Sequence, residues 1–374
     1  MDGSSPAAQP QFATLEVSII VPARDEESSL GACLESLTTQ AGVAFEIIVV
    51  DDGSSDRTRE IAQSFAGVRL ISAGPLPIGR AGKNWTGKNS ALVAGAKQAR
   101  APWLLFTDAD TVHQPGSLKR ALEEAKREQA DLLSYSPEQV VVTFAERAVM
   151  PVVFAELAAK YPLHKVREQN SAVVAANGQY VLVRRQVYDA VGGHFGVATE
   201  ILEDVALARL FRNAGRRVYF RYGGDAVRTR MYRSWPQLRE GWTKNLALLF
   251  PHPERLALQS FLFWTTAWLS MAVAVSGAFS RHYLWILSAA VWLLLYRRIR
   301  AAHFTTGNNL LAILFGVPMF AYLLRCSKQA HERGQVSWKG RAYRTDAASE
   351  STPASKQAAK PIPRIENQRL STEN

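Results

Sequence analysis

The uncharged stretch from Leu256 to Phe279 constrains this chain more than any other feature of its sequence. It runs for 24 residues without a formal charge and contains several Phe and Trp residues. A helix needs about 20 apolar residues to cross the hydrocarbon core of a bilayer. A buried core helix of a soluble protein is the alternative, and the length of the stretch argues against it. We therefore expect a transmembrane helix here.

Two further apolar segments follow this stretch. Residues 282–296 make a short segment that ends at three arginines, Arg297, Arg298 and Arg300, as suits the cytosolic end of a span. Residues 310–324 are interrupted by a Gly and a Pro, so a span, a bent interfacial segment and a buried core helix all stay open. We expect a membrane region over residues 251–326, with two spans and a third segment of undetermined depth.

The two ends of the chain differ from its middle. Residues 1–15 form a polar leader, expected to be flexible, without the basic and apolar regions of a signal peptide. We therefore expect the domain that follows to lie in the cytosol. From residue 325 onward the chain carries 10 Lys/Arg against 5 Asp/Glu and is rich in Ser, Ala and Pro. This composition predicts a mostly disordered basic tail over residues 327–374.

The chain is basic, with 44 Lys+Arg against 33 Asp+Glu and a net charge of +11. Between Val205 and Arg255, 11 basic residues oppose 3 acidic ones. A juxtamembrane segment that faces anionic lipid has this pattern, and so do arginines that face an anionic substrate. Nucleic-acid binding is a third alternative, but no such motif accompanies the charge, so we expect no nucleic-acid partner. Two distant cysteines, Cys33 and Cys326, exclude a disulfide framework and a cysteine-rich zinc site.

Residues 16–250 alternate short apolar runs with helical patterns. The runs at 17–21, 46–50, 68–71 and 104–106 predict buried strands, and the patterns at 26–39 and 54–65 predict helices. Strands that alternate with helices favour an α/β fold with a mostly parallel sheet. Ligands bind such sheets at the carboxyl ends of the strands. The residues that follow each strand are therefore the first candidates for a site.

Acidic residues follow two of these strands. Asp51 and Asp52 come after the second strand, where they either accept hydrogen bonds from a ribose or base or begin the next helix. Asp108 and Asp110 follow the fourth strand. Two carboxylates at this spacing could converge on Mg²⁺ or Mn²⁺ and leave positions open for phosphate oxygens. A solvated acidic turn is the alternative for this second pair.

Two later motifs stand at the start of helical segments. Gly87-Lys88 could bind phosphate through a helix N-terminus and the ammonium group. It lacks the spacing of a Walker A loop, which argues against a kinase or ATPase. Glu203 and Asp204 begin a later helix, where one carboxylate could be a general base. Acids that complement the helix dipole are the alternative there.

In their order and spacing, these motifs resemble family 2 glycosyltransferases, the inverting enzymes with a GT-A fold. The resemblance covers residues 16–250. It is carried by Pro-Ala-Arg-Asp-Glu at 22–26, Asp-Asp-Gly-Ser at 51–54, Gly-Lys-Asn-Ser-Ala-Leu at 87–92, Asp-Ala-Asp at 108–110 and Glu-Asp at 203–204. The runs at 177–179, 191–194 and 241–245, together with the apolar spans, resemble the membrane-associated branch that includes carotenoid- and hopanoid-associated glycosyltransferases.

The resemblance implies transfer of one sugar from a nucleotide-diphosphate sugar, in particular a UDP-sugar, to a lipid or isoprenoid-type acceptor. The reaction would take place at the cytosolic face of the cell membrane. Asp204 would be the catalytic base, and Glu203 would support it or meet the acceptor. The donor would be bound by Pro22, Arg24, Glu26, Asp51, Asp52, Lys88 and Asp108. The metal, Mg²⁺ or Mn²⁺, would be held by Asp108 and Asp110.

The sequence departs from the family pattern at two places, and alternative interpretations exist for one segment and for the function. The segment 237–242 only approximates the Gln-x-x-Arg-Trp motif of processive synthases, which favours transfer of a single sugar. Asp25 stands where Asn is commoner, a mild change. Residues 144–163 are amphipathic and either lie at the membrane interface or pack on the domain. A nucleotidyltransferase and a catalytically dead binding protein on the same fold are the alternative functions.

Overall fold

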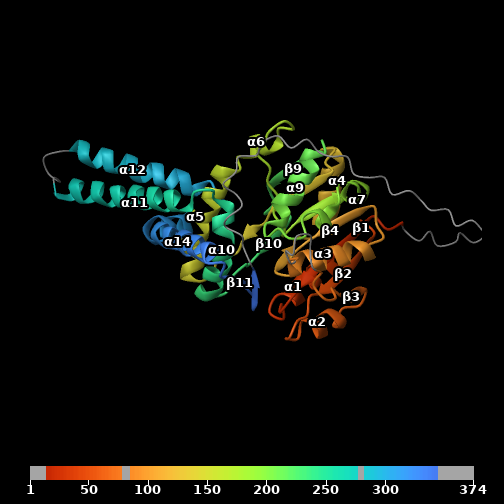
Figure 1. Ribbon diagram of the computed structural model, residues 1–374. Coiled ribbons are helices and arrows are strands. Elements are labelled where there is room, and N and C mark those ends of the chain that lie inside the picture. Colours follow the sequence, from red (N-terminus) through yellow and green to blue (C-terminus); the bar gives the residue numbers. More distant parts are fainter. Residues whose placement is uncertain (1–13, 78–84, 277–281, 344–374) are drawn as a thin grey trace, which may run out of the picture.

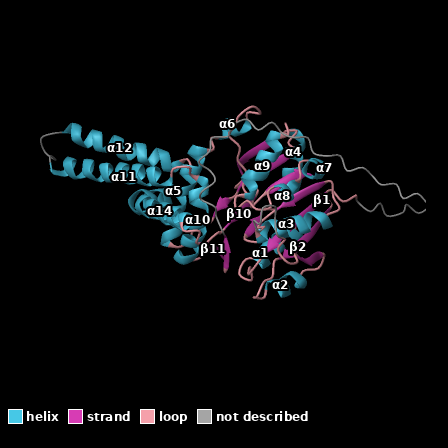
Figure 2. Cartoon of the chain, viewed as in Figure 1, coloured by secondary structure: helices cyan, strands magenta, loops and turns pink. Residues whose placement is uncertain are grey.

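The computed structural model describes residues 14–77, 85–276 and 282–343 of the chain. Figure 1 shows a large sheet with its helices at one end of the molecule and a set of C-terminal helices at the other. Figure 2 separates the strands of the sheet from this helical half. The predicted α/β architecture with a mostly parallel sheet is confirmed, and it forms the frame of the site described below.

The large sheet has seven strands in the order β3-β2-β1-β4-β8-β6-β9. The strands are β1 (Val17–Ala23), β2 (Phe45–Asp51), β3 (Val68–Ser72), β4 (Trp103–Phe106), β6 (Leu132–Ser136), β8 (Val181–Arg184) and β9 (Val218–Tyr222). Strands β1 to β4 run parallel to their neighbours in this group, whereas β8 is antiparallel to both β4 and β6. Since β1, β2 and β4 share one direction, the segments that follow them leave the sheet side by side at one edge.

Helices cover both faces of this sheet. They are α1 (Leu30–Thr38), α2 (Thr58–Ser64), α3 (Gly87–Gln98), α4 (Ser117–Arg127), α7 (Arg185–Ala190), α8 (Gly193–Gly196) and α9 (Glu203–Asn213). Side chains alternate along β1, so that Ile19 packs in a core with α1 and α4, whereas Ile20 packs with α3 and α9. This two-sided burial explains why the strands read as continuous apolar runs.

Two helices begin later than the sequence predicts. The patterns at 26–39 and 54–65 start as helices only at Leu30 and Thr58. The residues before them form turns in which the backbone N–H groups of Asp25 and Glu26 donate to the side chains of Ser54 and Thr58. These hydrogen bonds tie the turns after β1 and β2 together, and the turns lie at the edge where the strands end.

A smaller sheet and a long helix connect the two halves. The sheet has the order β5-β10-β7, formed by β5 (Thr111–His113), β10 (Val227–Thr229) and β7 (Glu138–Gln139). Helix α5 (Phe144–Lys160) begins with a capping box, and the short α6 (Leu163–Arg167) follows it. Helix α5 packs against α12 (His282–Arg300), α14 (Val317–Glu332) and the segments that precede α14. The amphipathic pattern at 144–163 therefore belongs to a helix packed on the C-terminal helices.

The C-terminal helices are α10 (Trp235–Leu249), α11 (Pro253–Ser276), α12 (His282–Arg300), α13 (Thr306–Leu311), the π-helical η2 (Ala312–Gly316) and α14 (Val317–Glu332). In Figure 1, α11 and α12 project together from the body of the molecule. A Cβ atom on Gly316 would overlap the carbonyl oxygen of Ala148 in α5, so glycine permits this close approach. The indole N–H of Trp264 in α11 donates to the Ile313 carbonyl at 2.8 Å, which fixes α11 to the π-helical turn.

Two of these helical segments are long and apolar enough to cross a membrane, namely 253–276 and 306–332. In the most apolar 18-residue part of the first segment, 11% of the residues are buried within the structure. In the corresponding part of the second segment, 50% are buried. The sequence analysis instead counted residues 282–296 as its second span. The three arginines at the end of α12 lower the mean hydropathy of this 19-residue helix, which explains the difference. Residues 277–279 of the first predicted span lie outside the described residues.

A β-hairpin follows α14, formed by β11 (Val336–Trp338) and β12 (Arg341–Tyr343). The segment 327–374, predicted to be a mostly disordered tail with disorder from Tyr343 onward, is ordered over residues 327–343. Composition did not predict this order, because the hairpin is held by ion pairs between Lys339 or Arg341 and carboxylates more than 280 residues earlier. The remainder of the predicted tail, 344–374, and residues 1–13 of the predicted leader lie outside the described residues.

Candidate active site

A cavity of about 480 Å³ opens where the parallel strands end, between the sheet, α5, α10 and the C-terminal hairpin. It brings together nine of the ten residues that the sequence analysis selected. These are Pro22, Arg24, Glu26, Asp52, Lys88, Asp108, Asp110, Glu203 and Asp204. Residues from five separate segments of the chain thus meet at the sheet edge, as expected for an α/β fold.

Asp51 is the selected residue that does not line this cavity. Its carboxylate accepts a hydrogen bond from the backbone N–H of Ser54 at 3.1 Å and lies 3.3 Å from the guanidinium of Arg59. Both contacts hold the turn that leads into α2. Asp51 therefore belongs to the turn before α2, which begins only at Thr58, and Asp52 is the carboxylate of this pair that faces the cavity.

The C-terminal hairpin approaches the loops after β1 and β2. Lys339 Nζ lies 2.6 Å from Glu26 Oε1 and donates to the carbonyl of Arg24 at 2.9 Å. Arg341 forms a two-pronged ion pair with Asp52, whose carboxylate is buried. Burial raises the pKa of Glu26, and the ammonium of Lys339 partly offsets this effect. The hairpin thus neutralises two carboxylates at this end of the cavity.

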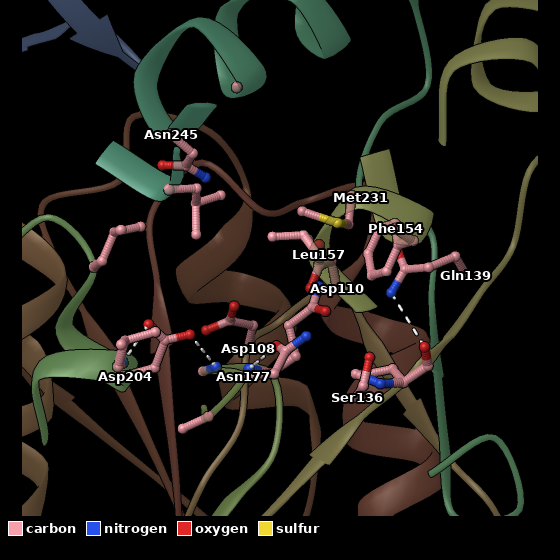
Figure 3. Close-up of a pocket in the computed structure, with 18 of the residues that line it drawn as sticks. Asp108, Asp110, Ser136, Gln139, Phe154, Leu157, Asn177, Asp204, Met231 and Asn245 are labelled. Carbon is pink, nitrogen blue, oxygen red and sulfur yellow. Dashed lines mark hydrogen bonds between the residues drawn. The ribbon is translucent and has the colours of Figure 1, made fainter. Parts of the chain in front are cut away.

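Asp108 and Asp110 leave β4 and enter the middle of the cavity, as Figure 3 shows. Burial and the neighbouring charge of Asp108 raise the pKa of Asp110 to about 8. The buried Asp110 Oδ1 has no hydrogen-bond partner among the described residues. An unpartnered carboxylate oxygen beside a second carboxylate has the chemistry that a hard divalent cation requires. No group of three or more His, Cys, Asp or Glu residues gathers as a metal site within the described ranges, so further ligands would come from a bound substrate or water.

Lys88 connects two parts of the site. Its ammonium lies 2.7 Å from Asp108 Oδ1 and 2.7 Å from Glu203 Oε1. Burial alone would lower the pKa of Lys88, but these two carboxylates outweigh burial and raise it well above its ordinary value. A permanently charged lysine therefore stands between the aspartates after β4 and the first turn of α9.

Asp204 lies at the start of α9, opposite the apolar wall of the cavity. Its carboxylate accepts hydrogen bonds from the backbone N–H groups of Gly178 and Val205, each at 2.8 Å. Burial and the adjacent charge of Glu203 raise the pKa of Asp204 to about 6. A Cβ atom on Gly178 would lie 3.0 Å from Lys88 Nζ and 3.1 Å from Glu203 Oε1, so a glycine gives the loop room to reach Asp204. The geometry provides an oriented carboxylate that is ionised at neutral pH.

The other wall of the cavity is apolar. It is formed by Phe154, Leu157, Met231, Trp242, Leu249 and Phe304 from α5, α10 and the segments around them. In Figure 3, Leu157, Phe154 and Met231 lie above Asp110 and on the side away from Asp204. Carboxylates and an apolar wall thus share a single space, which suits a ligand with one polar and one apolar end.

Several lining residues escaped the sequence analysis. Lys339 and Arg341 lie in a tail whose composition predicted disorder, and no local pattern marked them as part of a site. Lys244 and Asn245 belong to the run at 241–245, which was noted only as part of the resemblance. His303 stacks on Tyr222 with ring centroids 4.2 Å apart at the mouth formed by residues 301–305. These residues come from segments that fold over the sheet edge, so strand-end reasoning could not find them.

Comparison with known proteins gives a consistent result. Residues 18–192 match the family model "Glycosyl transferase family 2". The chain is 26% identical over 346 residues to 4,4'-diaponeurosporenoate glycosyltransferase of Staphylococcus aureus, which covers 87% of this chain and 88% of that protein. Among solved structures, a mannosyltransferase from Pyrobaculum calidifontis in complex with GDP-Man and Mn²⁺ is 16% identical, with a TM-score of 0.45 and coverage of 86% and 90%. TarS 1–349 of S. aureus with UDP-GlcNAc is 16% identical, with a TM-score of 0.42 and coverage of 86% and 93%.

The matched segment begins in β1 and runs beyond β8, and it contains Asp52, Lys88, Asp108 and Asp110. These residues line the same cavity in the structure. The motifs that carry the resemblance, the family match and the geometry of the sheet edge therefore agree. Residues 18–192, which form most of the α/β domain, therefore belong to glycosyltransferase family 2, and the chain is an enzyme that transfers a sugar from a nucleotide sugar.

Proposed function

We propose that the enzyme transfers one sugar, with inversion, from a nucleotide-diphosphate sugar to a lipid or isoprenoid-type acceptor at the cytosolic face of the cytoplasmic membrane. The observation that carries this proposal is the single cavity in which Asp204 faces an apolar wall that includes Leu157 and Phe304. A carboxylate suited to a base lies at the polar end, and the apolar end suits a lipid chain. A UDP-sugar is the donor we favour, from the family resemblance alone.

The nucleoside would bind at the end of the cavity formed by Pro22, Arg24, Glu26 and Asp52. Arg24 donates to the Asp52 carbonyl at 2.8 Å, which holds the two loops at a fixed separation. The carboxylates of Glu26 and Asp52 would accept hydrogen bonds from the ribose or the base. Binding would then exchange their ion pairs with Lys339 and Arg341 for contacts with the donor.

Asp108 and Asp110 would hold Mg²⁺ or Mn²⁺ together with the diphosphate. Such a cation supplies positive charge that stabilises the departing diphosphate. The unpartnered Oδ1 of Asp110 supports this role, and so does its raised pKa, because burial and the charge of Asp108 both disfavour an ionised carboxylate unless a cation binds beside it. Lys88 contributes a further positive charge beside Asp108.

Asp204 would remove the proton from the acceptor hydroxyl. Two backbone N–H groups orient its carboxylate, and its pKa of about 6 leaves it ionised at neutral pH while remaining basic enough to accept a proton. Glu203 would act through Lys88, which it contacts at 2.7 Å, or would meet the acceptor. Inversion requires one base on the acceptor side, and Asp204 is the carboxylate best placed for that step.

The surface of the C-terminal helices supports the proposed membrane location. Leu258, Leu262, Leu269, Ile286, Leu287 and Leu294 of α11 and α12 are exposed. Arg298, near the end of α12, pairs with the buried Glu156 of α5 at 2.7 Å, beneath the cavity wall. This arrangement supports a bilayer around α11 and α12, with the catalytic domain on the cytosolic side. An acceptor could then reach the apolar wall directly from the lipid.

The experiment uses the full chain in detergent with Mn²⁺, a polar lipid extract and a panel of radiolabelled UDP- and GDP-sugars. Label should enter the lipid phase, with one nucleoside diphosphate released per sugar transferred. The Asp204→Asn variant serves as the inactive control. Release of pyrophosphate in place of a nucleoside diphosphate would indicate nucleotidyl transfer. Label that reaches only water-soluble products would contradict the lipid acceptor.

A further inference from the structure

One cation of the cavity differs from the others in its surroundings. Five Lys and Arg side chains line the cavity, namely Arg24, Lys88, Lys244, Lys339 and Arg341. All except Lys244 lie within 4.0 Å of a carboxylate oxygen. No such pair involves Lys244 among the described residues, and its recorded side-chain contact is with the ring of Trp338, 5.1 Å from the centroid. Lys244 is therefore a cation without a carboxylate in direct contact within the part of the chain that the structure describes.

Lys244 is held firmly in this position. It lies in the middle of α10, and its carbonyl oxygen is 2.8 Å from His331 Nε2 of α14. One residue earlier, the Thr243 carbonyl accepts a hydrogen bond from Ser327, also on α14. Burial lowers the pKa of Lys244, although the charge of nearby Glu203 works in the opposite direction. A desolvated ammonium group is costly without a counter-ion, so the site favours binding of an anion.

The next residue on α10 carries a second unsatisfied group. The buried side-chain oxygen of Asn245 has no hydrogen-bond partner among the described residues. Figure 3 shows Asn245 extending from α10 toward the cavity, across from Asp108 and Asp204. The ligand that fits this part of α10 must therefore present an anion to Lys244 and a hydrogen-bond donor to Asn245.

We infer that Lys244 binds the diphosphate of the sugar nucleotide and that Asn245 accepts a hydrogen bond from a hydroxyl of the transferred sugar. This inference rests on the proposed diphosphate donor. A nucleotide sugar places hydroxyl donors next to its diphosphate, whereas a fatty or isoprenoid acid offers an anion without a neighbouring hydroxyl. The contact of Lys244 with Trp338 also places it beside the hairpin that covers the nucleoside end.

Lys244 would also serve in catalysis. The sugar–phosphate bond breaks with its electron pair on the diphosphate, while the bond between the acceptor oxygen and the anomeric carbon forms. Negative charge therefore grows on the diphosphate as the reaction proceeds. A fixed ammonium group at that point stabilises the transition state more than the ground state.

The test compares Lys244→Gln, Lys244→Arg and the wild-type full chain in detergent with Mn²⁺. Lys97→Gln, at an exposed position of α3, is the matched control. Calorimetric titration with UDP, GDP, ADP, CDP and dTDP identifies the nucleotide that binds, and the corresponding nucleoside is titrated beside it. We expect Lys244→Gln to weaken binding of the diphosphate by roughly 10- to 100-fold and to leave binding of the nucleoside unchanged. Lys244→Arg keeps the positive charge and should bind the diphosphate more tightly than Lys244→Gln does.

Equal affinity of Lys244→Gln and wild type for the diphosphate would overturn the inference, and so would an effect confined to the KM of the acceptor. Equal weakening of diphosphate and nucleoside binding would also overturn it, because a general disturbance of α10 would have that effect. If the wild-type chain binds none of the five diphosphates, the proposed donor itself is wrong. If the wild type binds a diphosphate and Lys244→Gln binds it equally well, the inference about Lys244 fails while the proposed donor stands.

Discussion

The guanidinium of Arg341 forms a two-pronged ion pair with the carboxylate of Asp52, although 289 residues separate the two in the chain. Asp52 follows β2 at the edge of the sheet, and Arg341 begins the last strand of the C-terminal hairpin. This end of the cavity is therefore completed by a segment that comes after all of the C-terminal helices. The order of residues 336–343 depends on carboxylates of the catalytic domain.

Replacement of Asp52 by Asn should loosen this hairpin. The change removes the charge that holds Arg341 but keeps the size of the side chain. Amide hydrogen exchange over residues 336–343 should become faster by roughly tenfold, which corresponds to about 1.4 kcal/mol. Asp225→Asn is the matched control, since its carboxylate pairs with Arg221 at an exposed site. Unchanged exchange over the hairpin in Asp52→Asn would mean that Arg341 does not hold it in solution.

Replacement of Asp204 by Asn should lower turnover by roughly 10²–10⁴-fold with little change in donor affinity. The amide preserves size and hydrogen bonding but cannot accept the proton of an acceptor hydroxyl. The measurement pairs steady-state kinetics with titration of the nucleoside diphosphate on the same preparation. Turnover near the wild-type value would remove Asp204 from the role of base.

The pH dependence of the reaction should report the same carboxylate. Because the pKa of Asp204 is raised to about 6 and the base must be unprotonated, kcat/KM should rise with pH up to about 6 and level off above it. Below that pH the rate should fall about tenfold per unit. Circular dichroism at each pH separates this loss from acid unfolding. A rate that stays constant between pH 5 and 7 would contradict the assignment.

Chelation should test the cation that we assign to Asp108 and Asp110. EDTA should abolish activity, and Mn²⁺ or Mg²⁺ should restore it, because the diphosphate would otherwise meet two carboxylates without a bridging charge. Asp110→Ala should lose activity at every metal concentration, whereas Asp189→Ala, at an exposed site on α7, should keep it. Full activity of Asp110→Ala in the presence of chelator would exclude a metal at this pair.

Strand-end reasoning selected Asp52, Asp108 and Asp110, which line one cavity because parallel strands bring their carboxyl ends together whatever the loops do. It could not separate Asp51 from Asp52. Adjacent side chains there point to different sides, and only the structure gives Asp51 its partners in the turn. The strand ends that carry cavity residues were therefore predictable from the sequence, but the orientation of each side chain was not.

The C-terminal half was harder to predict for a different reason. Residues 282–296 and 310–324 are equally long, and Gly316 and Pro318 made the second segment the weaker prediction, yet it is part of the longer apolar stretch 306–332. Half of that stretch is buried against other helices, a property that depends on packing with α5 and α10. The cavity residues Lys244 and Lys339 come from these same late segments, so a local pattern could not place them beside the sheet.

Labelling of Cys326 should locate the end of α14 relative to the membrane. Cys33 is fully buried, and burial raises its thiol pKa to about 12, so the natural chain has one reactive cysteine for this purpose. Cys326 is only half-buried, beside Arg325 near the end of the third apolar segment. Helix α14 is tied to α10 of the catalytic domain by Ser327, whose hydroxyl donates to the Thr243 carbonyl at 2.6 Å and accepts from Ala247 N–H at 2.8 Å. The end of α14 must therefore lie on the same side as that domain.

A membrane-impermeant maleimide should label Cys326 only after the cells are permeabilised. The Cys326→Ser variant gives the background, and labelling of intact cells would place both α14 and the catalytic domain on the outer face.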